Sequence, residues 1–235
     1  MKEIIKSIVP STMISSLKRF KREWIDDYQI KSYSQEGEDL ILREIFKQQQ
    51  EGFYVDVGAH HPQRFSNTYW FYKKGWHGIN IDAMPGSMVK FKKIRPRDIN
   101  LEVAIAANEK EMTFFSFSDP AINTFDEKLA ALRVEQNYSL INQDKIKAMP
   151  LQKILKDNLP KDINIDFMSI DVEGLDLEVV QSNDWQIFRP RCILVESLNA
   201  TINKIKADPI YNFAIEQKYE LFAKTCRTLI FIDVR

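Results

Sequence analysis

The amino-acid sequence predicts an α/β protein with a mostly parallel seven-stranded sheet, a C-terminal antiparallel hairpin strand and helices on both faces of the sheet. Two observations lead to this prediction. Along most of the chain, short apolar runs of strand length alternate with segments of helical periodicity, which is typical of βαβ units. At the end of the chain, residues 220–235 hold two apolar runs joined by a short polar turn. We therefore expect one continuous sheet domain over residues 33–235.

Residues 1–32 precede that domain and are expected to form an N-terminal helical extension. Met13, Leu17, Phe20 and Trp24 recur at helical spacing, with lysines and arginines beside them. Amphipathic helices of this kind more often pack on a protein core than lie on a membrane surface. Packing on the domain is therefore the expectation for this helix.

The first half of the domain is expected to alternate helices and strands. The first helix leads through Gly52 into an apolar run that ends in Asp-x-Gly, as a buried strand before a tight turn does. Gly75 closes the next helix, and Pro85 can begin another. The expected elements are a helix at 36–48, a strand at 53–58, a helix at 67–74, a strand at 78–83, a helix at 85–94, and strands at 99–106 and 112–118.

The second half follows the same alternation after residues 119–150, which are polar and carry no pattern that assigns them. Gly174 marks the turn between a strand that ends at Asp171 and the helix after it. The expected elements are a helix at 151–158, a strand at 163–171, a helix at 175–182, a strand at 191–197, a helix at 202–218 and the two strands of the hairpin.

Charge and composition exclude several classes of function. The 33 basic and 33 acidic side chains cancel, so no global field draws the chain onto nucleic acid or anionic lipid. No run approaches the ~20 apolar residues of a membrane span, and the N-terminus lacks the pattern of a signal peptide. The sequence therefore predicts a cytoplasmic protein with a small-molecule partner, no nucleic-acid partner and no transmembrane segment. A homo-oligomer is left open.

Polar residues gather at the predicted carboxyl ends of the strands, where open α/β sheets bind their ligands. Acids are depleted in buried strands and costly there unless paired, so several of them in such positions indicate a site. These residues are Asp56, Gly58, His60 and His61 after the first strand, Asp82 after the second, Asp171 and Glu173 after 163–171, and Glu196, Ser197 and Asn199 after 191–197.

Gly58 and Asp82 together suggest an adenosine-type cofactor. A glycine lets the backbone approach a ligand closely, and an acid at the end of the next strand can accept hydrogen bonds from a ribose diol. The GxGxxG turn that accommodates the pyrophosphate of a nicotinamide cofactor is missing, since residues 53–65 contain one glycine. No GxxxxGK[ST] phosphate-binding loop occurs in the chain either.

Five segments in order resemble the FkbM family of methyltransferases. They are YSQEGEDLIL at 33–42, FYVDVGAHHP at 53–62, SNTYWFYKKGWHGINIDA at 66–83, RPRDINLEVAIA at 95–106 and SIDVEGLDLEVV at 169–180. The resemblance implies a Rossmann-like class I methyltransferase fold. It also implies that S-adenosylmethionine binds at the first three strand ends and that the acceptor is a hydroxyl group of a sugar or natural product.

By position, the resemblance also assigns roles to individual residues. Asp56, Gly58 and Ala59 match the cofactor loop of the family, and Asp82 matches the ribose-binding acid. Ala104 falls where the third strand passes the adenine. Gln35 and Asp39 are expected to close over the cofactor. His60 stands where a second loop glycine is often found in the wider class of methyltransferases.

Removal of the acceptor proton needs a base, for which Asp171, Glu173, His60 and His61 are the candidates. A divalent ion is a further option, because some related O-methyltransferases hold one at the ends of the fourth and fifth strands. Asp171, Glu196 and Asn199 offer the oxygen ligands that Mg²⁺ prefers. The alternative, that these acids only accept hydrogen bonds from substrate or backbone, stays open.

The function expected from these features is O-methylation of a sugar or glycan precursor of the polysaccharide or capsule type. The sugar comes from the family resemblance alone. A nitrogen or a phosphate-linked small molecule is an alternative acceptor, and a non-catalytic nucleoside-binding partner subunit is the competing class. The acids at four strand ends favour the enzyme.

Overall fold

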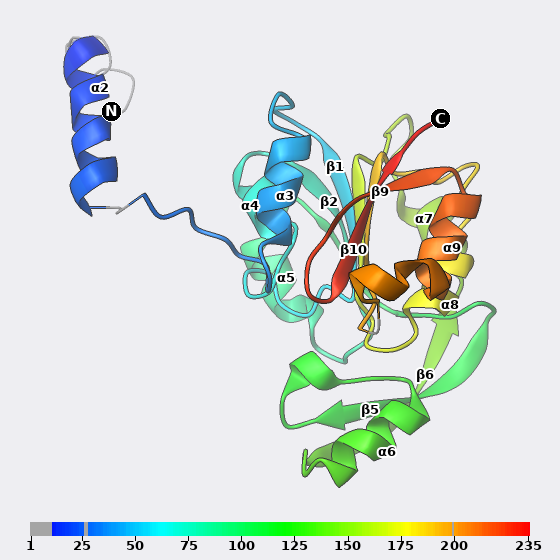
Figure 1. Cartoon of the computed structure of the whole chain (residues 1–235). Coiled ribbons are helices and arrows are strands. Elements are labelled where there is room, and N and C mark those ends of the chain that lie inside the picture. Colours follow the sequence, from blue (N-terminus) through cyan, green and yellow to red (C-terminus); the bar gives the residue numbers. More distant parts are fainter. Residues whose placement is uncertain (1–10, 26–27, 199) are drawn as a thin grey trace. The chain divides into compact units, whose positions relative to one another are not determined.

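The computed structural model describes residues 11–25, 28–198 and 200–235, and the chain divides into two compact units at Ser32 and Tyr33. The smaller unit contains α2 (Ser11–Phe20), which continues into the π-helical turn η1 (Lys21–Ile25) (Figure 1). The helix predicted for this region is confirmed. None of the described helices combines the length and the apolar character that crossing a bilayer requires.

The larger unit is built on a seven-stranded sheet in the order β3-β2-β1-β7-β8-β10-β9. Strands β3, β2, β1, β7 and β8 pair in parallel, whereas β10 is antiparallel to both β8 and β9. The predicted fold class is therefore confirmed. The bounds are β1 (Phe53–Val57), β2 (His77–Asp82), β3 (Ile99–Glu102), β7 (Phe167–Ile170), β8 (Cys192–Glu196), β9 (Tyr219–Lys224) and β10 (Thr228–Asp233).

Helices cover both faces of this sheet (Figure 1), because alternate side chains of each buried strand point to opposite faces. From β1, Tyr54 packs with the residues of α3 and α4, while Val55 and Val57 pack with those of α7, α8 and α9. The bounds are α3 (Glu38–Ile45), α4 (Tyr69–Lys73), α5 (Met88–Ile94), α7 (Leu151–Asn158), α8 (Asp176–Gln181) and α9 (Pro209–Glu216).

A second, three-stranded sheet in the order β4-β6-β5 lies between the third and fourth strands of the large sheet in the sequence. The strand expected at 99–106 is in fact two strands. Val103 donates its backbone N–H to the Asp82 carbonyl at 3.0 Å, and the chain then leaves the large sheet. The elements of this insert are β4 (Ala104–Ile105), β5 (Lys110–Phe117), the short η2 (Pro120–Ile122), α6 (Glu127–Glu135) and β6 (Leu140–Met149).

The single helix expected over 202–218 is wrong. The structure has a 3₁₀ segment, η3 (Ile202–Ala207), followed by α9, which begins at Pro209. Proline has no backbone N–H and disfavours the helical conformation of the residue before it, so it starts a helix and does not continue one. Asp208 caps the new helix by accepting a hydrogen bond from the Tyr211 N–H at 2.9 Å.

Candidate functional site

A cleft that is partly open to solvent lies at the carboxyl ends of β1, β2 and β7. This position suits a small-molecule ligand, because open α/β sheets bind their ligands at the strand ends. One wall consists of the strand ends, and the opposite wall comes from the insert. The lining includes Gln35, Gly58, His60, Phe65, Asp82, Met84, Phe114, Asn123, Thr124, Phe125, Asp171 and Glu173.

Gly58 directly follows β1 and lies against the backbone of Asp171, the residue that follows β7. Its φ of +78° is one that other residues rarely adopt, and a Cβ at this position would lie 1.6 Å from the Asp171 carbonyl oxygen. The glycine is therefore required by the neighbouring strand. This is a different reason from the close approach to a ligand that the sequence suggested.

Asp82 fixes the two loops that enter the cleft. One carboxylate oxygen accepts from the His60 N–H and the other from the Met84 N–H, both at 2.8 Å. Burial raises the pKa of this carboxyl, while these amide hydrogen bonds oppose the rise. Each oxygen retains a further lone pair, so the carboxylate can still accept from a ribose diol.

A mostly apolar hollow adjoins the cleft and shares Gly58 and Asp82 with it. Val103 and Ile105 line it, whereas Ala104 between them packs against Ala106 and Ala148 of the small sheet. Successive side chains of an extended segment point to opposite sides. Val103 and Ile105 therefore face this hollow, whereas the side chain of the predicted Ala104 points away from it.

Neither Asp56 nor Ala59 is among the residues that line the cleft, and Ala59 packs with Met88 and Phe91 of α5. Asp56 accepts a hydrogen bond from the Thr68 hydroxyl at 2.6 Å, and Thr68 in turn accepts one from Arg95 at 2.8 Å. Arg95 is fully buried and also donates to the Pro62 carbonyl at 2.7 Å. This network connects β1 to the loop that contains Pro62, and in it Asp56 accepts a hydrogen bond from the protein itself.

Gln35 and Asp39, the two residues expected to close over the cofactor, differ in whether they reach the cleft. Gln35 lines the cleft, whereas Asp39 is fully buried and shapes the segment that carries Gln35. Its carboxylate accepts from the Tyr33 N–H at 3.1 Å and from the Ser34 hydroxyl at 3.0 Å, and it pairs with Arg43. Of these two residues, Gln35 is the one in position to contact a ligand in the cleft.

The two histidines of the first loop differ in their surroundings. His60 lines the cleft with φ +49°, and its buried Nε2 has no hydrogen-bond partner among the described residues. His61 uses Nδ1 to accept from the Gln63 and Arg64 N–H groups at 3.2 and 3.1 Å. Burial lowers the pKa of both histidines, so His60 is a neutral imidazole able to accept a proton.

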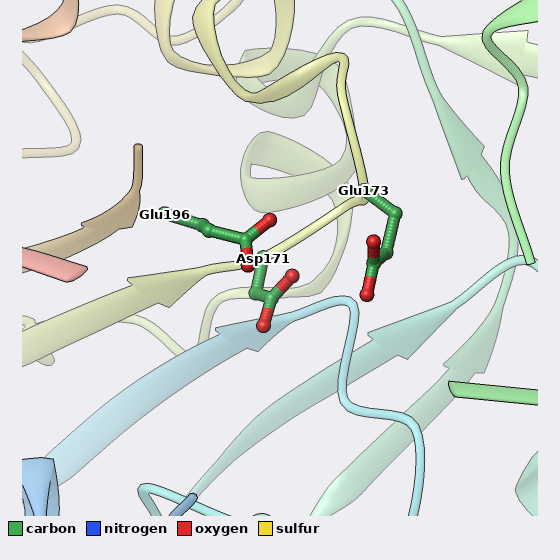
Figure 2. A group of neighbouring side chains, drawn as sticks. All are labelled: Asp171, Glu173 and Glu196. Carbon is green, nitrogen blue, oxygen red and sulfur yellow. The ribbon is translucent and has the colours of Figure 1, made fainter. Parts of the chain in front are cut away.

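Three carboxylates meet at the ends of β7 and β8 (Figure 2). Among the described residues, Asp171, Glu173 and Glu196 each offer an oxygen within 4.8 Å of the others. Burial and the adjacent Glu196 carboxylate raise the pKa of Asp171 well above its usual value. Burial and nearby acids raise the pKa of Glu196 to about 8. Asn199, which the sequence offered as a metal ligand, lies outside the described residues.

Glu173 is held by the insert, through contacts that the sequence did not reveal. Its carboxylate pairs with Arg133 of α6, and its backbone carbonyl accepts from the Thr124 hydroxyl at 2.6 Å. Its φ of +55° is uncommon for a residue other than glycine. The insert also places Phe114 and Phe125 in the cleft, with ring centroids 4.8 Å apart.

Comparison with models of known protein families identifies the family of this chain. The family model described as "Methyltransferase FkbM domain" matches residues 56–223, which is most of the chain. The chain belongs to the FkbM methyltransferase family. No curated protein sequence matches it.

The FkbM protein is also similar to three solved methyltransferase structures at low identity. A TehB-like SAM-dependent methyltransferase from Corynebacterium glutamicum has 9% identity and a TM-score of 0.41, with 96% of this chain and 100% of that chain covered. An O-methyltransferase from Bacillus cereus in complex with SAH has 10% identity and a TM-score of 0.43, with 99% of this chain and 96% of that chain covered. A putative O-methyltransferase from Klebsiella pneumoniae has 11% identity and a TM-score of 0.41, with 99% of this chain and 96% of that chain covered.

The FkbM protein is thus an S-adenosylmethionine-dependent methyltransferase, and its cleft fits that cofactor. The Asp82 carboxylate, aimed into the cleft, suits a ribose, and the adjoining apolar hollow suits an adenine ring. Gly58 and Gln35 border the same space. These residues would hold the cofactor beside the carboxylates of β7 and β8.

Proposed function

We propose that this methyltransferase transfers a methyl group to a hydroxyl oxygen of a sugar or glycan precursor. The observation that carries the proposal is the composition of the cleft beyond the cofactor residues. Phe65 and Phe114 offer aromatic rings, while Asp171 and Glu173 offer carboxylate oxygens. Apolar rings against the faces of a sugar and acceptors toward its hydroxyls are the chemistry that a polyhydroxylated ring requires.

S-adenosylmethionine supplies an electrophilic methyl group, and the chain must orient the acceptor and take up its proton. In the transfer, the acceptor oxygen forms a bond to the methyl carbon as the bond from carbon to sulfur breaks. The proton of the hydroxyl leaves in the same step and needs an acceptor at the cleft.

Two groups of the cleft can take that proton. The buried Oδ1 of Asp171 and the buried Nε2 of His60 have no hydrogen-bond partner among the described residues. The raised pKa of Asp171 makes its ionised form a stronger base than an ordinary aspartate. His61 uses its Nδ1 to hold the loop, and Glu173 is paired with Arg133, so both are less suited to act as the base.

The test is methyl transfer by the purified full chain from methyl-labelled S-adenosylmethionine to a panel of free, nucleotide-linked and lipid-linked sugars. Amines and phosphorylated small molecules form the second arm of the panel. Labelled methyl ethers of a sugar would support the proposal. Transfer to the amine or phosphate arm alone would overturn it.

Asp171→Asn connects that activity to the site. We expect kcat to fall by about 100-fold or more with little change in affinity for S-adenosylhomocysteine, because the carboxylate acts on the acceptor and not on the cofactor. A parallel fall in cofactor affinity would move Asp171 from the chemical step to cofactor binding.

A further inference from the structure

We propose that Asp171, Glu173 and Glu196 form a binding site for a divalent cation with oxygen ligands, such as Mg²⁺ or Mn²⁺. The three side chains come from two neighbouring strand ends and lie close together (Figure 2), and Asp171 and Glu173 also line the cleft. The inference depends on the proposed function only for the hydroxyl that the cation would bind.

The distances fit shared coordination. Opposite ligands of an octahedral Mg²⁺ lie about 4 Å apart, and those of Ca²⁺ about 5 Å apart, given metal–oxygen bonds of roughly 2.1 and 2.4 Å. The three carboxylate oxygens all lie within 4.8 Å of one another. A set made only of oxygens selects hard cations and disfavours zinc or copper.

The hydrogen bonding of the cluster is also incomplete. Glu196 is only 6% exposed, and its Oε2 is buried without a partner among the described residues. The Oδ1 atom of Asp171 is likewise buried without a hydrogen-bond partner among the described residues. Buried carboxylate oxygens are normally satisfied, so two unpartnered ones in a single cluster indicate a missing ligand.

The local charge balance calls for a cation as well. Arg133 is the cation in direct contact with the cluster in the described part of the chain, and it pairs with Glu173 alone. Arg227, which acts on Glu196 from a greater distance, is paired with Glu36 at 3.4 Å. Asp176 adds a further buried acid close by. Either a bound cation or protons must offset these charges.

A cation here would give the acceptor end of the cleft a definite chemical preference. Three protein oxygens leave about half of the positions of a six-coordinate ion open to water or acceptor oxygens. A hydroxyl bound there would lose its proton at a lower pH than a free hydroxyl. The preferred acceptors would then carry two neighbouring oxygens, as the diols of sugars do.

The test is binding of Mn²⁺ to the full chain after chelator treatment and gel filtration, followed by electron paramagnetic resonance and titration calorimetry. We expect one site per chain and release of protons on binding, because cation and protons compete for the same carboxylates. Glu196→Gln and Asp171→Asn should each weaken binding by at least about tenfold. Glu109→Gln is the matched control, since this acid pairs with Lys153 on the surface and should leave binding unchanged.

Folding of the variants is checked through the thermal midpoint of the cation-free proteins. Glu196→Gln removes one of the crowded acids of the cluster, so its midpoint should equal or exceed that of the cation-free parent, whereas only the parent should gain stability from Mn²⁺. No Mn²⁺ binding by the parent, or equal binding by Glu196→Gln, would overturn the proposal and leave a shared proton as the alternative. Sugar methylation at an undiminished rate in excess chelator would defeat the cation site while preserving the proposed function.

Discussion

Gly58 allows the end of β1 to lie directly against the backbone that follows β7. We predict that Gly58→Ala lowers the free energy of unfolding by about 3 kcal/mol or more, because the Cβ would collide with the Asp171 carbonyl and the backbone would keep a positive φ. Urea denaturation monitored by fluorescence measures the loss.

Gly75→Ala is the control for that experiment. Gly75 also has a positive φ, +108°, but a Cβ there meets no atom within 4 Å. Gly75→Ala should therefore lower the free energy of unfolding by only about 1 kcal/mol, the cost of the backbone conformation alone. Equal losses in the two variants would mean that the approach of β1 to β7 is not what requires the glycine at position 58.

Asp82 is the residue whose carboxylate faces both the loops and the cofactor space. We predict that Asp82→Ala weakens binding of S-adenosylhomocysteine by about 10- to 100-fold, because hydrogen bonds to a charged acceptor contribute roughly 1.5–3 kcal/mol. Titration calorimetry measures the affinity. Glu102→Gln is the matched control, since Glu102 accepts from the Gly86 N–H at 2.9 Å without lining the cleft. An affinity that survives Asp82→Ala would remove Asp82 from the cofactor site.

At the scale of elements, β5 supplies one wall of the cleft through one of its two faces. Phe114 lines the cleft beside Phe125, whereas Phe115 points to the other face and packs with Phe117 and Ala130. We predict that Phe114→Leu raises KM for the sugar acceptor by about fivefold or more and leaves the affinity for S-adenosylhomocysteine unchanged. Steady-state kinetics at saturating cofactor measures the change.

Phe115→Leu provides the comparison on the same strand. Both side chains are buried and the substitution is identical, so the two variants should lose similar stability. Only Phe114→Leu should change the KM for the acceptor. If Phe115→Leu raises KM equally, the insert affects the acceptor through its general stability and not through a contact in the cleft.

The elements also differ in how far the sequence predicts them. The strands β1, β2, β7 and β8 are almost entirely buried and therefore appear as continuous apolar runs. By contrast, half of the residues of β6 are exposed and only Ala148 is buried, so the strand carries no apolar run that would predict it. The break before α9 does have a local signal, Pro209, which an apolar pattern on both sides of it conceals.

The site is predictable to the extent that it depends on strand ends. Asp82, Asp171 and Glu196 directly follow or end apolar runs, and this pattern alone places them at one edge of the sheet. The contact of Arg133 with Glu173 joins segments 40 residues apart, and no local pattern records it. For Ala104, the sequence predicts a strand but does not reveal that the side chain packs with Ala106 and Ala148.

At the scale of the whole molecule, the cleft and the core both come from the unit that begins at Tyr33. The buried clusters draw on residues from Leu42 onward, and Gln35 is the first residue to line the cleft. The catalytic fold should therefore not require residues 1–32.

We predict that a chain of residues 33–235 folds cooperatively and binds S-adenosylhomocysteine within about twofold of the full chain, because every side chain of the cofactor space is retained. Calorimetry and thermal unfolding test this. The thermal midpoint separately reports whether α2 packs on the sheet, since loss of such packing lowers it by several degrees, about 2–4 °C per kcal/mol. A chain of residues 44–235 is the control, because it lacks the buried Leu42 and should unfold more easily. Loss of cofactor binding in the 33–235 chain would show that the N-terminal extension helps to build the site.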